Sequence, residues 1–207
     1  YVARIAQGLD ERGFHSVWAV DHILITKHIQ SDYPYAKDGS FPVDPTLLGL
    51  EPFNLLSFIA AHTKKLRLGT GVVVLPQRNP ALTAKQAADV DVLSGGRLDF
   101  GIGRSGFARQ YKIYNIDYGE SQERFEESLT VLRKAWTGEK FCHAGKYYQV
   151  VDAQLIPVPI QKPHPPMRMA ASSPGTFKTV SEEGLPLFVG LRGDGLYQGT
   201  GAYPDNA

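Results

Sequence analysis

The sequence predicts an α/β fold in which all the main strands are parallel, and three observations lead to that prediction. Residues 66–107 run from an apolar stretch through a breaker cluster, a helical pattern and a double glycine to a second apolar stretch. That order is typical of a parallel βαβ unit. The uninterrupted apolar run Val72–Leu75 suits a parallel strand covered on both faces. Helical and strand patterns also alternate along the rest of the chain. A doubly wound sheet and a (β/α)8 barrel both fit this pattern.

The N-terminal part of the chain begins the alternation. Residues 1–12 have the spacing of an amphipathic helix, which Gly13 ends. A short buried strand is expected at His15–Val20, followed by a long polar and aromatic loop at residues 23–49. Loops of this length in a compact domain tend to be functional. The next helix is expected at Phe53–His62.

The central βαβ unit has the clearest boundaries. Its first strand is expected at Arg67–Leu75. Asn79 and Pro80 form a good helix start, because asparagine caps the first turn and proline suits the first helical position. The helix is expected to end at the double glycine 95–96. The second strand of the unit is expected at Arg97–Ile102.

The second half of the chain repeats strand and helix patterns around one inserted hairpin. The expected elements are an aromatic loop (104–118), a helix (120–136), a hairpin (141–151), an extended proline-rich linker (157–166), a strand (167–171), a helix ending near Glu183 and a strand (185–190). Five strands of one parallel sheet are therefore expected, with a separate hairpin.

Composition excludes several classes of protein. The 207 residues are 43% hydrophobic and 21% charged, as in an ordinary globular domain. The 22 basic and 21 acidic residues give a net charge of +1, which argues against a nucleic-acid-binding surface. The single cysteine excludes an intramolecular disulfide and fits a reducing compartment. No apolar run reaches the roughly 18 residues of a membrane span, and no signal peptide opens the chain. We therefore expect a cytoplasmic protein that binds neither nucleic acid nor membrane.

Both ends of the chain indicate a fragment. It opens without methionine, on a helical pattern that no strand precedes, and it closes on a glycine-rich stretch with little periodicity. Residues 1–192 are assigned to one α/β unit and residues 193–207 to an irregular tail.

Candidate functional residues follow the predicted strands, at the ends where ligands bind in open α/β sheets and in barrels. The first strand delivers Asp21 and His22. A histidine there can act as a general acid or base near neutral pH, with Asp21 as its orienter or as a second polar contact. The alternative is a structural hydrogen bond, which is the commoner role of a lone histidine.

Two further strand ends have the character of anion sites. Gly101–Gly106 matches G-x-G-x-x-G, but the helix and acidic residue of a dinucleotide site are missing at the expected places. Its glycines still let N–H groups approach an anion that Arg104 can bind, unless Arg104 is only a surface arginine. Ser172 and Ser173 precede a helix and can bind an anion there or simply cap it. No His or Cys pattern indicates a metal site.

Several longer motifs carry a family resemblance. They are SVWAVDH (16–22), LRLGTGVVVLPQRNP (66–80), LSGGRLDFGIGR (93–104), AWTGE (135–139), GKYY (145–148), PHPP (163–166) and GLPL (184–187). Together they resemble the luciferase-like flavin monooxygenase superfamily, whose members are (β/α)8 TIM barrels, from about Gly13 to Arg192. The resemblance implies that residues 1–192 are an incomplete barrel containing strands two to six.

The resemblance also implies roles at individual positions. His22, next to Asp21, is the implied acid/base beside flavin and substrate. A non-prolyl cis peptide under the isoalloxazine ring is implied at Gly71-Val72. The implied ligands of the flavin phosphate are Arg104, Ser172, Ser173 and Thr176.

The implied function is an oxidoreductase, specifically a monooxygenase that uses reduced FMN and O2 on a small organic substrate. Loops 23–49 and 104–118 would form its lid and substrate walls. A flavin reductase and a second copy in a homodimer are the implied protein partners. Two alternatives stay open: a hydride-transfer oxidoreductase that uses the deazaflavin coenzyme F420 on the same barrel, and a non-catalytic flavin-binding barrel.

The chain departs from bacterial luciferase in three respects. Gly103 stands where that protein has a reactive cysteine, and Gln122 stands where it has a second phosphate-binding arginine. Arg124 is a candidate substitute for that arginine. The first strand and the last two are also missing, and an eight-stranded barrel cannot close on the remainder. We therefore expect the 207 residues alone to be poorly stable and flavin-free.

Overall fold

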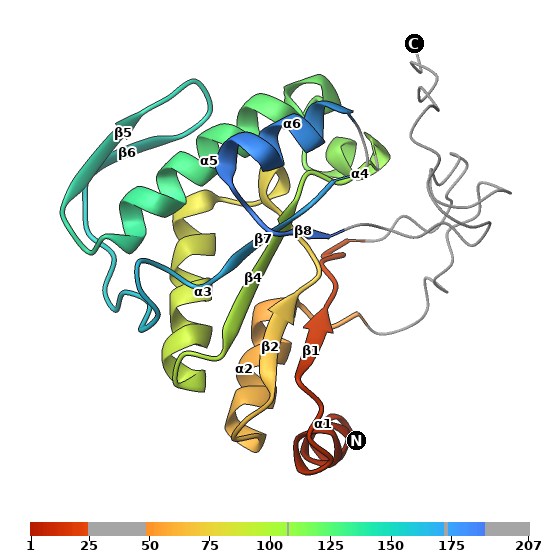
Figure 1. Ribbon diagram of the computed structural model, residues 1–207. Helices are drawn as coiled ribbons and strands as arrows, with labels where there is room; N and C mark the ends of the chain where they lie inside the picture. The colour runs from red at the N-terminus through yellow and green to blue at the C-terminus, as the bar shows by residue number, and fades with distance from the viewer. Residues whose placement is uncertain (25–48, 107, 172–173, 189–207) are drawn as a thin grey trace, which may run out of the picture.

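The computed structural model describes residues 1–24, 49–106, 108–171 and 174–188, in which strands and helices alternate (Figure 1). Most of its strands form a single parallel sheet. The strands of that sheet, in the order in which they lie side by side, are β1 (Ser16–Ala19), β2 (Arg67–Thr70), β4 (Leu98–Gly103), β7 (Met167–Ala170) and β8 (Leu187–Phe188), with β3 (Val73–Val74) paired to β4.

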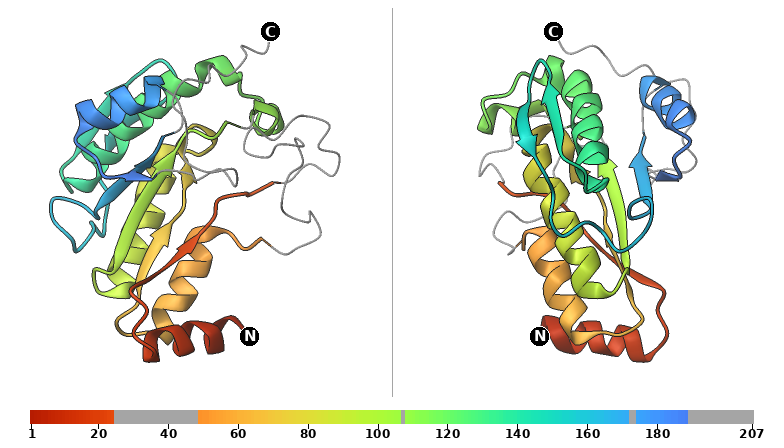
Figure 2. Two further views of the ribbon diagram at one scale, coloured as in Figure 1. Left: turned by 45° about the vertical axis from the view of Figure 1, so that its right-hand side comes forward. Right: turned by 90° about the vertical axis from the view of Figure 1, so that its left-hand side faces the viewer.

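The strands of this sheet lie in the same order as they occur in the chain. A doubly wound sheet would reverse that order at a switch point. The sheet therefore has the winding of a (β/α) barrel, and its curl is visible in Figure 2. Among the described residues the outer strands β1 and β8 do not pair with each other, so this part of the barrel is open. The predicted incomplete barrel is confirmed.

Helices pack against one face of the sheet. There, α2 (Pro52–His62), α3 (Pro80–Ser94) and α5 (Ser121–Trp136) lie side by side, with α1 (Val2–Glu11) against α2 (Figures 1 and 2). Trp136 is fully buried in this layer. Its ring meets the Phe100 ring edge-on at 5.4 Å, and its Nε1 donates to the carbonyl of Ala84 at 3.0 Å. The core thus lies between the helices and the sheet.

The boundaries of α3 follow from local chemistry, as the sequence predicts. The Asn79 side chain accepts a hydrogen bond from the Leu82 amide at 3.1 Å. Gly95 ends the helix with φ of 69°, a left-handed conformation that glycine adopts without steric cost.

The predicted hairpin is also confirmed. Strands β5 (Phe141–Ala144) and β6 (Gln149–Ala153) pair antiparallel and lie outside α5 (Figure 1).

Two sequence predictions were wrong in detail. The predicted strand Arg67–Leu75 is divided at residues 71–72, because the backbone there leaves the ladder of β2 and resumes as β3 against β4 alone, before the 3-10 turn η1 (Leu75–Gln77). The predicted loop 104–118 contains the helix α4 (Ala108–Ile113) and leads into the 3-10 turn η2 (Tyr118–Glu120). Helix α4 buries the ring of Tyr111. The sequence around it had no clear start or stop signal for a helix, so the segment was predicted as a loop. Most of the predicted loop 23–49 lies outside the described residues.

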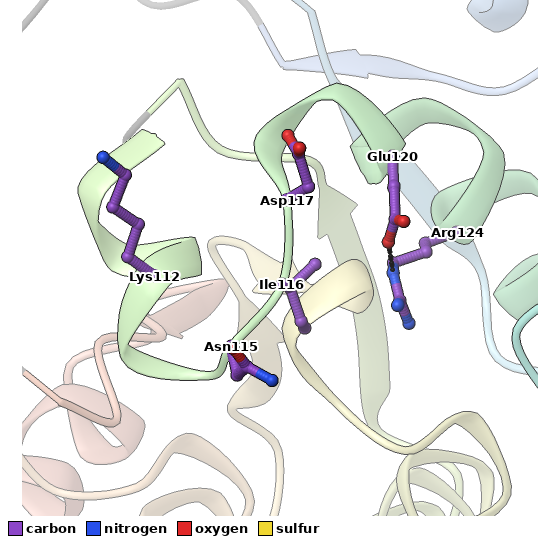
Figure 3. Close-up of a pocket in the computed structure, with 6 residues that line it drawn as sticks. All are labelled: Lys112, Asn115, Ile116, Asp117, Glu120 and Arg124. Carbon is purple, nitrogen blue, oxygen red and sulfur yellow. Dashed lines mark hydrogen bonds and ion pairs between the residues drawn. The ribbon is translucent and has the colours of Figure 1, made fainter.

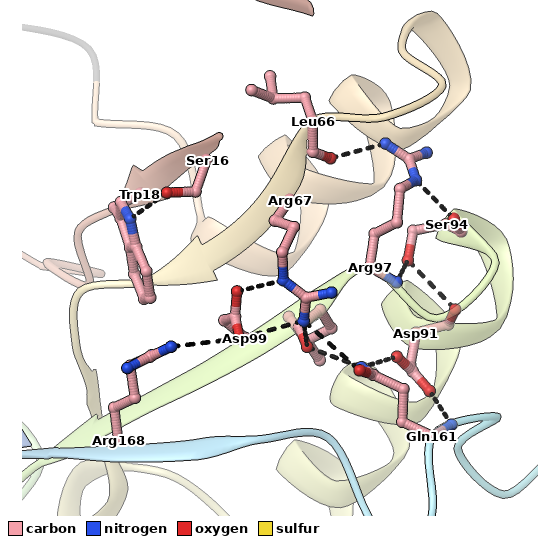
Figure 4. Close-up of polar contacts among 11 residues, drawn as sticks. Ser16, Trp18, Leu66, Arg67, Asp91, Ser94, Arg97, Asp99, Gln161 and Arg168 are labelled. Atoms are coloured by element: carbon pink, nitrogen blue, oxygen red, sulfur yellow. Dashed lines mark hydrogen bonds and ion pairs between the residues drawn. The ribbon is translucent and has the colours of Figure 1, made fainter. Parts of the chain in front are cut away.

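The face of the sheet opposite the helices carries a polar layer near the amino ends of the strands (Figure 4). The guanidinium of Arg67 donates to both oxygens of Asp99, at 2.7 and 3.1 Å. Arg67 also donates to Gln161 at 3.4 Å, and Arg168 lies 4.0 Å from Asp99. In barrels this end of the sheet serves stability rather than catalysis.

Replacing Asp99 with asparagine is expected to lower the free energy of unfolding by about 2 kcal/mol. The Asp99 side chain is 3% exposed, and the substitution removes the charge that it shares with Arg67 and Arg168. Because Arg67 is 27% exposed, water can solvate its guanidinium and reduce the loss of stability. Urea unfolding of the native protein measures the change. Asp152→Asn, in an exposed pair with Lys140, is the control and is expected to cost less than about 0.5 kcal/mol. Equal effects of the two substitutions would contradict the structural role of Asp99.

Candidate active site at the carboxyl ends of the strands

The sequence-predicted site residues within the described ranges lie at one rim of the sheet. Because its strands are parallel, their carboxyl ends point the same way, toward α4 and the start of α5 (Figure 1). Asp21 and His22 follow β1, Gly71-Val72 follows β2, and Arg104 follows β4. Thr176 lies in the first turn of α6 (Pro174–Glu183), after β7, and is buried. Ser172 and Ser173 lie outside the described residues.

Asp21 anchors this rim through an arginine that the sequence did not single out. Both Asp21 oxygens accept hydrogen bonds from the Arg78 guanidinium, at 2.7 and 2.9 Å, and one also accepts from the Val74 amide at 2.9 Å. Arg78 donates to Glu51 as well, at 2.9 Å. The carboxylate of Asp21 thus holds the end of β1 to η1, and its effect on His22 is that of a nearby charge.

His22 is half-buried, and its Nδ1 lies 3.0 Å from the side-chain nitrogen of Gln110. Burial lowers the pKa of His22 below its usual value of 6.5, and the charge of Asp21 opposes part of that shift. A histidine with this environment is neutral at physiological pH and is able to exchange a proton.

The Gly71-Val72 peptide is cis, at the position that the family resemblance implied. Its surroundings explain two glycines. The indole of Trp18 crosses Gly69 so closely that a Cβ there would lie 2.1 Å from the ring, and a Cβ on Gly103 would lie 2.6 Å from Cγ2 of Val72. A cysteine at position 103 would therefore collide with Val72, which gives a structural reason for the glycine found there.

Arg104 is held where β4 ends. Its Nη1 donates to the hydroxyl of Ser121, the first residue of α5, at 3.1 Å. Its carbonyl oxygen accepts a hydrogen bond from the hydroxyl of Tyr111. Burial raises the pKa of Tyr111 well above its usual value, so this hydroxyl stays protonated and remains a donor. The guanidinium is thereby positioned at the rim.

Arg124 is engaged elsewhere. Its Nε donates to Glu120 at 2.9 Å, and its guanidinium lies 4.3 Å from the centroid of the Tyr147 ring. It also borders a cavity of about 400 Å³ between α4 and the start of α5 (Figure 3), lined by Lys112, Asn115, Ile116, Asp117, Glu120 and Arg124. Two carboxylates balance the two cations of this cavity, so it lacks the excess positive charge of a phosphate site.

The rim has the donors that a flavin phosphate needs. Strands β4 and β7 are neighbours, with Ile102 opposite Met169, so Arg104 and the segment that leads to α6 follow adjacent strands at the same rim. A guanidinium and the N-terminal turn of a helix at one rim suit a phosphate. The described residues therefore fit the cofactor that the resemblance implied.

Nearly the whole chain matches one protein family. Residues 1–203 match the family described as luciferase-like monooxygenase. The chain belongs to this family.

One sequence relative and two solved structures are similar to this chain. The oxygenase component of a flavin-dependent trigonelline monooxygenase from Acinetobacter baylyi is 29% identical over 187 residues, which are 89% of this chain and 46% of that protein. The FMN complex of the oxygenating constituent of 3,6-diketocamphane monooxygenase from Pseudomonas putida has a TM-score of 0.70 at 18% identity, over 91% of this chain and 50% of that one. An F420-dependent secondary alcohol dehydrogenase has a TM-score of 0.72 at 20% identity, over 90% of this chain and 52% of that one.

These comparisons establish that the chain belongs to the luciferase-like monooxygenase family. The two structural likenesses lie below 25% identity and show the fold alone. The chain spans about half the length of the relatives it matches. None of the helices in the described part is long and apolar enough to cross a membrane. Within the same ranges, no group of three or more His, Cys, Asp or Glu side chains is arranged to hold a metal ion.

Proposed function

We propose that this rim binds the flavin of a monooxygenase that uses reduced FMN and O2 on a small organic substrate. The observation that carries the proposal is that His22, Gly71-Val72, Arg104 and Thr176 follow the neighbouring strands β1, β2, β4 and β7 at one rim. Bound reduced flavin would supply two electrons to O2, so that one oxygen atom enters the substrate and the other leaves as water.

The roles of the chain's own residues follow from their positions. Arg104 and Thr176 would bind the phosphate, with Ser172 and Ser173 as further hydroxyl donors, and Gly71-Val72 would support the flavin ring. His22 would give or take a proton at the reaction centre. The relative from Acinetobacter baylyi is named as an oxygenase component, which supports a separate flavin reductase as partner. A homodimer and a cytoplasmic location stay predictions.

Arg104→Gln is expected to weaken the binding of FMN at least about tenfold, because a charge-assisted hydrogen bond to phosphate contributes about 1.5–3 kcal/mol. Riboflavin lacks the phosphate, so its binding should change little. Fluorescence titration of the native protein with each ligand measures both affinities. Arg124→Gln is the matched control and should leave both unchanged, because Arg124 is paired with Glu120. Equal losses for FMN and riboflavin would assign Arg104 to the fold and not to the phosphate.

A deazaflavin-dependent hydride transferase is the second candidate, supported by the fold shared with the F420-dependent alcohol dehydrogenase. Anaerobic reduction followed by exposure to O2 separates the two functions. The proposed enzyme consumes O2 when its bound flavin is reduced. Binding of F420 in preference to FMN, with no O2 consumption, would replace the proposed function by the second candidate. Flavin binding without turnover on any substrate would favour a non-catalytic barrel.

A further inference from the structure

Helix α4 buries an amide against the candidate acid/base. Gln110 is 5% exposed, and its side-chain nitrogen Nε2 lies 3.0 Å from Nδ1 of His22, 88 residues earlier in the chain. An amide N–H can only donate. The ring nitrogen that it meets must therefore accept, and an accepting imidazole nitrogen carries no proton. In the neutral ring the proton then resides on Nε2.

The position of Gln110 is set by its neighbour. Tyr111 is fully buried, its hydroxyl donates to the carbonyl of Arg104, and its ring meets Tyr118 edge-on at 5.2 Å. The Ile116 amide also donates to the Tyr111 carbonyl, at 3.0 Å. One short helix thus contacts His22 through Gln110 and the Arg104 backbone through Tyr111.

The amide of Gln110 makes its described side-chain contact through its nitrogen. Its oxygen Oε1 is buried and accepts no hydrogen bond within the described ranges. Leaving a buried acceptor unpaired costs about 1–3 kcal/mol, and amides that only fill a core are almost always paired at both ends. Gln77 and Gln86 each have a buried, unpaired amide atom as well, so it is the contact with His22, and not the unpaired oxygen, that distinguishes Gln110.

We propose that Gln110 is a positioning residue that holds His22 as the tautomer with its proton on Nε2. The nitrogen that exchanges protons in the reaction is then Nε2, while Nδ1 is reserved for orientation. This inference rests on the proposed function for the catalytic use of the proton, but the tautomer itself is a property of the protein without flavin.

The amide also opposes charging of the ring. Protonating Nδ1 would set an N–H against the N–H groups of Gln110, so the imidazolium loses this hydrogen bond. Among the described residues, the charged groups toward His22 are Asp21 before it, Arg78 on Asp21, and Glu51 on Arg78. The charges of Asp21 and Arg78 also act on the titratable phenol of Tyr114. The charge of Asp21 favours the charged ring, and burial works with Gln110 against it.

Nitrogen-15 NMR of the His22 ring in the native protein tests the proposal. The expected spectrum has an unprotonated Nδ1 and a protonated Nε2 above pH 6.5, with a titration midpoint below 6.5. Gln110→Glu replaces the donor with a carboxylate, and it is expected to move the proton to Nδ1 and raise the midpoint by about 1 unit or more. Gln110→Leu should lose the tautomer preference. Gln154→Glu, an exposed charge-matched control, should leave the ring unchanged.

A proton on Nδ1 of His22 in the unsubstituted protein would overturn the proposal, and this measurement needs no variant to fold. A Gln110→Glu protein with an unchanged His22 spectrum would overturn it as well. If the tautomer is as expected but no flavin binds, the proposed function fails and the positioning by Gln110 stands. If flavin binds and turns over while the proton is on Nδ1, the function stands and the positioning fails.

Discussion

Replacing His22 with glutamine is expected to lower kcat about 10²- to 10⁴-fold, which is the usual contribution of a positioned acid or base. Glutamine can keep a hydrogen bond to Gln110 but cannot exchange a proton near neutral pH. The proposed phosphate donors Arg104 and Thr176 follow other strands, so FMN affinity should stay within about twofold of the original value. Stopped-flow kinetics of single turnovers measures kcat, and a fluorescence titration measures the affinity.

His62→Gln is the control for this substitution. That ring lies on the outside of α2 and pairs with the carbonyl of Phe58 at 2.8 Å, so its loss should change neither quantity. A His22→Gln enzyme with full turnover would remove histidine from the chemistry. A parallel loss of FMN affinity would make His22 a binding residue instead.

The same histidine has an effect on stability with a defined sign. Because burial lowers the folded pKa of His22 below 6.5, the unfolded chain takes up the proton first as the pH falls. Above about pH 6.5 the ring is neutral in both states, so His22 does not reduce the free energy of unfolding there. That free energy declines as the pH falls from about 6.5 toward the lowered pKa of the folded state. His22→Gln should make unfolding less sensitive to acid in this window, as urea titrations at several pH values can show.

Local chemistry made much of the fold predictable from the sequence. Asn79 with Pro80 and the turn glycine Gly95 set the ends of α3, because caps act within one helical turn. The strand ends were also predictable, since His22 and Arg104 directly follow apolar runs. That is why the expected site residues that the structure describes lie on one rim. The alternation alone did not predict the winding of the sheet, because barrels and doubly wound sheets share it; only the family resemblance predicted a barrel.

The residues that hold the site together had no local signal. Arg78 meets Asp21 across 57 positions, and Gln110 meets His22 across 88. Such pairs form only once the strands are side by side, so spacing along the chain says nothing about them. Tyr111 was visible as part of an aromatic stretch, but its burial against Arg104 depends on the fold of residues 104–118. The sequence thus located proposed catalytic groups and missed the residues that position them.

Arg78 offers the sharpest test of that positioning. Its side chain is 7% exposed and forms ion pairs with Asp21, which is 2% exposed, and with Glu51. It also lies 5.3 Å from the centroid of the Phe53 ring. Arg78→Leu leaves a buried carboxylate with one backbone donor, and it is expected to lower the free energy of unfolding by about 3–5 kcal/mol. Urea unfolding measures the loss.

Further variants decide whether the ion pair of Arg78 with Asp21, and not Arg78 alone, is responsible for this loss of stability. Arg78→Lys should lose less than Arg78→Leu, because an ammonium keeps the charge but not the two-pronged contact. Arg4→Leu, at an exposed position, should cost less than about 0.5 kcal/mol. The double variant Asp21→Leu/Arg78→Leu should be more stable than the sum of its single changes implies, because it buries no unpaired charge. Strict additivity would mean that Asp21 and Arg78 act independently, and the anchoring of the His22 segment would then need another cause.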